Sequence, residues 1–151
     1  MRWVTRARPK IDRIACPWLI KRFIDAEAEF LFVAPDQVDR VARETGAIPY
    51  DVAGVELSHV GPKCSFDAFV EKYGFEDPYV AELAVIVRGA DTDRLDLAPQ
   101  AAGLLAISLG LSHNFPDDHE MLGYGFVVYD ALYAWLRFFR GERHSWNPQR
   151  D

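Results

Sequence analysis

Short runs of strand-forming residues bounded by turn signals stand in the first sixty positions of this chain, and the later apolar patterns have helical spacing. Trp3, Val4 and Thr5, and then residues 29–33, are short runs rich in β-branched and aromatic side chains, which favour strands. From residue 65 onward, apolar residues recur at intervals of three and four. We therefore predict an α+β fold, in which short β-α-β-α and hairpin elements form a small sheet before a mainly helical second half.

Two helices are expected between these first strands. Asp12 can cap a helix over residues 12–25, in which Pro17 is tolerated if it lies in the first turn. A second helix is predicted over residues 35–45, with Gly46 as its stop signal.

Residues 48–52 and 55–59 alternate in polarity around a turn at Ala53 and Gly54, which predicts a hairpin. His59 would share the inner face of the second arm and be at least partly buried. The remaining patterns predict helices over residues 65–73, 77–89, 97–110 and 116–140, the last being the longest.

The length of 151 residues is typical of one domain, and 50% hydrophobic content is enough for a core. We expect a single domain over residues 1–151, with a frayed tail after about residue 141. The sequence has no secretory leader pattern and no stretch of about 18 uncharged apolar residues. We therefore expect a cytoplasmic protein with no membrane partner.

Charge is distributed unevenly along the chain. Residues 1–22 carry seven Lys or Arg and one acid, whereas the rest of the chain has a formal charge of −12. This asymmetry predicts a cationic patch for a small anion, with Lys10, Arg13 and Arg22 as contacts. The overall pI of about 5.2 argues against nucleic acid. Arg88 is a fourth candidate, because an Arg in an apolar helix needs a partner.

Two cysteines, Cys16 and Cys64, lie too far apart in sequence for a paired-thiol zinc motif, and we expect free thiols. Cys16 follows Arg13 near a predicted helix start, a setting that lowers a thiol pKa and creates a nucleophile. It also continues an apolar helix face, so a core thiol is the alternative. Cys16 is thus a weak catalytic candidate.

Two histidines have neighbours that suit a metal ion. His59 is separated from Cys64 by a Gly-Pro loop, and imidazole with thiolate can bind a borderline metal. His119 follows Asp118 at the start of the last helix, where carboxylates also serve as caps. If the loop reaches that helix start, His59, Cys64 and His119 form one site. The alternatives are a core histidine and a simple capping cluster.

Asp91, Asp93 and Asp96 follow a helix end within six residues. Their spacing lacks the glycine and terminal glutamate of a calcium loop. Pairing with nearby arginines is the default interpretation.

Ordered blocks of the sequence stand at residues 10–25, 54–59, 64–69, 86–91, 95–105, 117–121 and 129–135. Together they resemble the C-terminal domain of the chromate-resistance ChrB family, over about residues 5–137. The resemblance implies a link to chromate, because longer family members are associated with chromate-responsive regulation of efflux. Chromate is a tetrahedral dianion, which cations and helix-start amides can hold. The positions in these blocks that have chemistry are Asp12, Arg13, Cys16, Arg22, His59, Cys64, Arg88, Asp91, Asp118, His119, Asp130 and Tyr133.

Our leading hypothesis is a metal- or oxyanion-binding domain of a chromate-response protein. The ligands expected for zinc, iron or manganese are His59, Cys64, Asp118 and His119. The alternative is a small metal- or thiol-dependent redox enzyme that detoxifies chromate or related oxidants, so enzymatic activity stays open. A structural adaptor is a third option. The expected partners are a small anion such as chromate and, as one option, a second copy in a homodimer, without nucleic acid for this chain alone.

Overall fold

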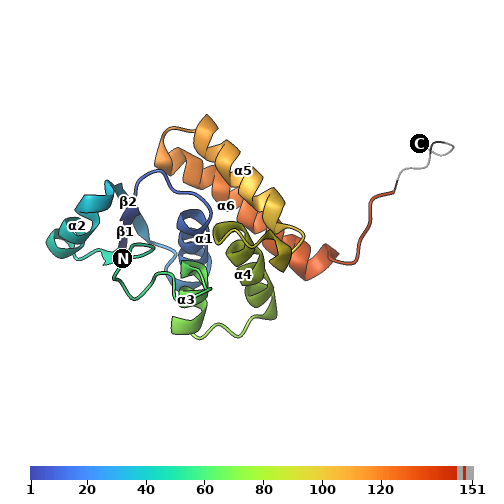
Figure 1. Ribbon diagram of the computed structural model, residues 1–151, viewed down its shortest axis with the longest axis horizontal. Helices are drawn as coiled ribbons and strands as arrows, with labels where there is room; N and C mark the ends of the chain where they lie inside the picture. Colours follow the sequence, from blue (N-terminus) through green and yellow to red (C-terminus); the bar gives the residue numbers. More distant parts are fainter. Residues whose placement is uncertain (146–147, 149–151) are drawn as a thin grey trace.

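A small parallel sheet forms one end of the molecule in the computed structural model, which describes residues 1–145 and 148 (Figure 1). Strand β1 (Arg2–Arg6) lies in the centre, between β2 (Glu29–Val33) and β3 (Ile48–Pro49). Both neighbours are parallel to β1, with Trp3 opposite Phe30 on one side and Ile48 on the other. The predicted strands at residues 3–5 and 29–33 are confirmed.

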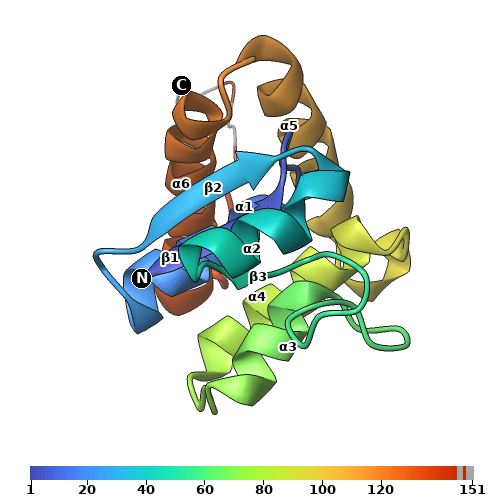
Figure 2. The same ribbon diagram turned by 90° about the vertical axis from the view of Figure 1, so that its left-hand side faces the viewer.

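Helices cover both faces of this sheet. Val4 packs with Val38 of α2 (Val38–Thr45), whereas Trp3 faces the main core, which includes α1 (Asp12–Leu19). A 3-10 turn, Pro35–Gln37, precedes α2, and Gly46 ends it with φ of 74°, as the stop signal predicted. Figure 2 shows α2 in front of the strands.

The first helix differs from its prediction at its cap and at its proline. Ile11 occupies the capping position, without a side-chain hydrogen bond, and Asp12 is the first helical residue. A π-helical segment, Ile20–Ile24, continues α1, so the predicted range is confirmed, but Pro17 lies inside the helix and not in its first turn. Proline has no N–H to donate to the carbonyl one turn earlier, which costs a helix hydrogen bond. Burial of the surrounding Cys16, Trp18 and Leu19, each at most 1% exposed, offsets that cost.

The predicted hairpin is wrong. Strand β3 has two residues, and the chain from residue 50 to residue 63 is a loop with one isolated bridge, between Val60 and Lys63. Positive φ values at Asp51 (51°) and Gly54 (84°) turn the backbone out of strand geometry. Leu57 still points inward and is 2% exposed, whereas the side chain of His59 is 42% exposed.

The second half is helical, as predicted, and the α+β fold class is confirmed. The described residues form α3 (Ser65–Lys72), α4 (Pro78–Asp91), α5 (Ala101–Asn114) and α6 (Asp118–Ala134), which the π-helical segment Trp135–Phe139 continues. A 3-10 turn, Leu95–Leu97, precedes α5, which therefore starts later than expected. Cys64 occupies the capping position of α3, and Ser65 is the first helical residue.

Helix α1 lies at the centre of the helical part and packs against α3, α4 and α6. Its first residues therefore face the ends of several other elements. No helix in the described part of the chain is long and apolar enough to cross a membrane. Residues 142–145 form no helix or strand, and the rest of the predicted frayed tail, residues 146–147 and 149–151, lies outside the described residues.

Candidate metal centre

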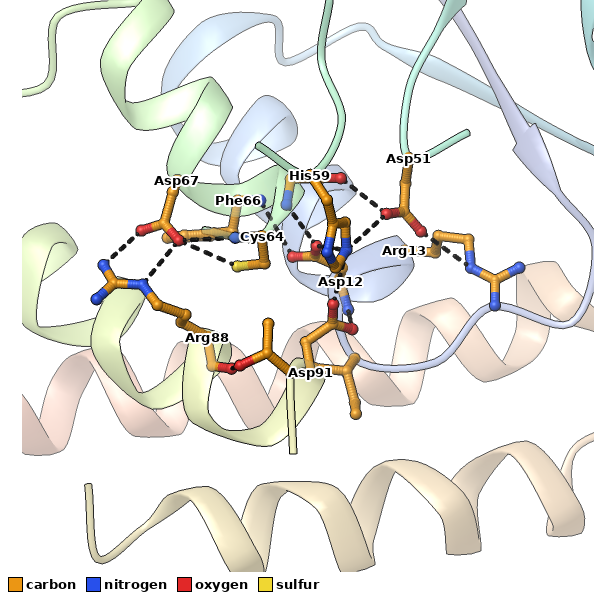
Figure 3. A network of polar contacts seen from close by, with 12 residues as sticks. Asp12, Arg13, Asp51, His59, Cys64, Phe66, Asp67, Arg88 and Asp91 are labelled. Atoms are coloured by element: carbon orange, nitrogen blue, oxygen red, sulfur yellow. Dashed lines mark hydrogen bonds and ion pairs between the residues drawn. The ribbon is translucent and has the colours of Figure 1, made fainter. Parts of the chain in front are cut away.

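One imidazole nitrogen and three carboxylates meet where α1 begins, α4 ends and the loop after β3 passes (Figure 3). His59 Nε2 lies 2.9 Å from Asp91 Oδ2, and 3.3 Å from both Asp12 Oδ2 and Asp51 Oδ1. We call these four residues the Asp-His cluster. Since they are up to 79 positions apart in sequence, only the tertiary fold creates the group.

Asp12 is fixed at the base of the cluster. Its side chain is 1% exposed, and it accepts hydrogen bonds from the N–H groups of Ser65 (2.7 Å) and Phe66 (3.1 Å). These amides begin α3, so the positive end of that helix stabilises the carboxylate. The preceding Ile11 has φ of 33°, which β-branched residues avoid, and its carbonyl accepts a hydrogen bond from Tyr129. Such strain is common at functional sites.

Asp51 is held from two sides. Its Oδ1 accepts a hydrogen bond from the Ser65 hydroxyl (2.7 Å), and its Oδ2 lies 3.3 Å from nitrogens of both Arg6 and Arg13. Burial and the neighbouring Asp12 nevertheless raise the pKa of Asp51. Asp51 therefore approaches His59 with an oxygen that is already fixed in position.

The concentrated negative charge perturbs the remaining two members. Burial, with repulsion from Asp12 and Asp51, raises the pKa of Asp91 to about 7. The hydrogen bond to Asp12 raises the pKa of His59 to about 9, although partial burial opposes this change. The cluster thus retains protons, because bound protons reduce the repulsion between its carboxylates. A metal ion could supply that positive charge instead.

Donor atoms of Asp12, His59 and Asp91 lie within 4.8 Å of one another, close enough to share one metal ion. Carboxylates with one imidazole suit manganese, iron or zinc. Metal binding requires neutral His59: Nε2 would lose its proton and coordinate the ion through the lone pair. Among the residues that the structure describes, no other group of three such donors is as close.

Of the four predicted metal ligands, His59 alone belongs to this cluster. The ring of His119 packs edge-on against Phe32, with centroids 5.2 Å apart. Asp118 accepts hydrogen bonds from the backbone N–H (3.0 Å) and side chain (2.7 Å) of Arg8. The loop after β3 runs toward α1 and α4, and not toward the start of α6, so the structure does not bring the imidazoles of His59 and His119 together.

Cys64 belongs to a second network beside the cluster. Arg88 donates two hydrogen bonds to Asp67, at 2.9 and 2.8 Å, and Asp67 Oδ2 accepts the N–H of Cys64 at 3.0 Å. Burial acts to raise the pKa of Asp67, but the hydrogen bonds from Arg88 and Cys64 bring it below its ordinary value. Arg88 therefore has the partner that its position in the sequence requires.

Neither thiol has the setting of a nucleophile. Cys16 and Cys64 are free and 0% exposed. Burial first, and then the charge of Asp12, raises the pKa of each thiol. This is opposite to the lowered pKa that a reactive Cys16 would need, so the core-thiol alternative describes it correctly.

The predicted N-terminal cation patch is divided among separate ion pairs. Arg13 contacts Asp51, whereas Arg22 forms a two-point contact with Asp130, at 3.0 and 2.9 Å. Lys10 is exposed. The three do not form one anion pocket.

Two clefts open on either side of His59. One, of about 720 Å³, is lined by Arg6, Asp51 and the following loop residues. The other, of about 470 Å³, is lined by Lys63, Arg88, Asp91 and Arg94, together with nearby residues. The cluster is therefore accessible from outside, although Asp12 at its base is buried.

Sequence reasoning missed Asp12 and Asp91 as ligands and did not consider Asp51. One signal was present at Asp91, the last residue of α4. A carboxylate there opposes the negative end of the helix dipole, so it needs a cationic partner elsewhere. Asp12 gave a weaker signal, as an acid followed by an apolar helix.

Comparison with known proteins supports a family assignment. A family model described as the C-terminal domain of ChrB matches residues 3–136. Protein ChrB of Cupriavidus metallidurans is 32% identical over 133 residues, which are 87% of this chain and 40% of that protein. The chain thus spans less than half the length of this relative. No solved structure matches. The matched range contains the whole Asp-His cluster.

Proposed function

The chain belongs to the ChrB C-terminal domain family, and from this premise we propose that it is a metal-binding domain with a role in the response to chromate. The proposed ion is held by Asp12, His59 and Asp91. Asp51 Oδ1 lies 3.3 Å from His59 Nε2 but outside this donor group, and it adds negative charge beside the ion.

The convergence of three carboxylates on one imidazole nitrogen carries this proposal. Asp12, Asp51 and Asp91 are 1%, 7% and 15% exposed, so little water screens their mutual repulsion. A fold that only needed to cap α3 would require Asp12 alone. A divalent cation accounts for all three acids together, because it neutralises most of their charge.

The donor set indicates which ions to test. Oxygen-rich donors with one nitrogen favour manganese or iron(II), and zinc also accepts this combination. Both thiols lie outside the donor group, so the site lacks the soft ligands that would select copper(I).

The proposed link to chromate rests on the family assignment. The thiol-dependent version of the redox alternative has less support, since both thiols are buried and their pKa values are raised. Direct capture of an anion by Lys10, Arg13 and Arg22 also has less support, because both arginines already pair with aspartates.

Metal content tests this function directly. The untagged protein is treated with chelator, incubated separately with manganese(II), iron(II) or zinc(II), desalted, and analysed for bound metal. We expect about one ion per chain in the parent and a large loss in His59→Ala and Asp91→Asn. His119→Ala is the matched control, since its imidazole packs against Phe32.

The proposal fails if the parent retains none of these metals, or if His59→Ala and Asp91→Asn both retain as much as the parent. Loss of metal in His119→Ala alone would instead support the site predicted from the sequence. Circular dichroism of each variant establishes that it is folded before its metal content is compared.

A further inference from the structure

The cleft lined by Lys63, Arg88 and Arg94 carries a concentration of positive charge that the proposed metal site does not explain. It brings three cationic side chains to one side of His59 and Asp91. The opposite cleft offers Arg6, whose guanidinium already contacts Asp51. The cationic cleft is therefore the better place for an anion.

Donors remain available in this cleft. The ammonium of Lys63 is exposed and makes no hydrogen bond or ion pair in the described part of the chain. Arg88 and Arg94 contact their aspartates through Nε and Nη2, so Nη1 of each has no protein partner among the described residues. A guanidinium has five N–H groups, and two such contacts leave the others free.

The cleft also faces the proposed ion. His59 and Asp91 line its wall, whereas Asp12 lies beneath them and is 1% exposed. Manganese and iron accept more donors than the three that the cluster offers, since their preferred octahedral geometry has six positions. The open positions must then face a cleft, and in this one an oxygen ligand could reach the ion.

Without the ion, the same place repels anions. Asp91 lines this cleft, and Asp12 and Asp51 belong to the same cluster, so up to three negative charges lie at or near its inner end, of which the charge of His59 offsets one. A dianion would meet these charges at short range, and Lys63 alone would not outweigh them. Binding of the anion therefore needs the metal ion.

We propose that this cleft is a metal-dependent subsite for a tetrahedral oxyanion such as chromate, resting on the metal site proposed above. One anion oxygen completes the coordination of the ion, and Lys63 and Arg94 donate hydrogen bonds to the others. Because coupling between two binding sites is reciprocal, the anion also raises the affinity for the metal by the same factor.

Titration calorimetry tests this coupling with sulfate, which is not an oxidant, and with chromate. Each anion is titrated into the full chain after chelator treatment and again after loading with manganese(II). We expect at least tenfold tighter binding by the metal-loaded protein, because the ion supplies one additional charge-assisted interaction with the anion. Equal binding in both states, or none to metal-loaded protein, overturns the proposal.

Variants then test the position of the subsite. In Lys63→Ala and Arg94→Ala, anion affinity should fall about tenfold, while manganese affinity without anion stays within about twofold of the parent. Lys72→Ala is the control, because this exposed lysine pairs with Glu56 and does not line the cleft. Unchanged anion affinity in both cleft variants would overturn the assignment.

The two proposals fail in different ways. If the parent binds no metal, the metal site and the subsite are both wrong. If it binds metal at His59 and Asp91 but shows no metal-dependent anion binding, the metal site stands and the subsite alone is wrong.

Discussion

Asp91→Asn should make the metal-free protein more stable at alkaline pH while it removes a metal ligand. Asp91 lies 2.9 Å from His59 and beside two further carboxylates, in a position that is 15% exposed. Asparagine has nearly the same shape and carries no charge. The substitution therefore removes repulsion within the cluster without leaving a cavity.

The size of the effect follows from the pKa of Asp91. Its value rises from 3.8 to about 7 on folding, so this raised pKa destabilises the folded state relative to the unfolded chain by about 4 kcal/mol at pH 8 and by less than about 2 kcal/mol at pH 5. Through this group, the parent loses stability as pH rises from about 4 to 7. We expect Asp91→Asn to gain about 2–3 kcal/mol relative to the parent between pH 5 and pH 8.

His59 adds to this trend. Its pKa is raised to about 9, so it stabilises the folded state below its ordinary value of 6.5, and that contribution is lost as pH rises through 9. Asp91 itself is mostly protonated at pH 5, so its substitution changes this contribution little there. The attraction between ionised Asp91 and charged His59 near pH 8 acts to lower the pKa of Asp91 and is therefore already included in the value of about 7.

Urea denaturation of chelator-treated protein at pH 5, 6, 7 and 8 measures this difference. Asp96→Asn is the control, because Asp96 is exposed and its contact with Arg94 lowers its pKa, so it stays ionised over this range. A stability difference between Asp91→Asn and the parent that does not change with pH would refute the reasoning. A difference that changes in the opposite direction would refute it as well.

Gly125→Ala should cost about 1–3 kcal/mol, because a Cβ there would lie 2.5 Å from Ile14 Cγ2, whereas Gly123→Ala has open space and should be neutral or slightly stabilising in thermal melts. Asp67→Ala leaves the partly buried Arg88 without its carboxylate and should lower the free energy of unfolding by about 3 kcal/mol in urea titrations, so a change near zero contradicts the pairing. Both thiols should react with a disulfide reagent only after denaturation, and rapid reaction of the native protein would contradict their burial.

Local signals in the sequence were enough for most of the fold. Residues 29–33 combine strand-forming side chains with a following Pro35, and Gly46 ends the next helix, so neighbouring residues determine these elements. The loop after β3 was harder, because the alternation over residues 55–59 is also compatible with an irregular segment. The positive φ of Asp51 there depends on contacts with Arg6, Arg13 and Ser65, which are distant in sequence.

The site was less predictable, because it too depends on contacts between residues that are distant in sequence. His59 was identified as a candidate ligand, but its partners are Asp12 at the start of α1, Asp91 at the end of α4, and Asp51 eight positions earlier in the same loop. Sequence proximity favoured Cys64 instead, whose thiol faces Asp67 within the neighbouring network. The packing of α1 against α3 and α4 decides which acids meet, and no local pattern encodes that packing.

Anomalous diffraction from crystals of the manganese-loaded protein is the most direct test of the metal centre. A single anomalous peak within coordination distance of Asp12, His59 and Asp91 is the result that we predict. A peak at His119 and Asp118, or no peak near His59 in crystals that contain manganese elsewhere, would contradict it.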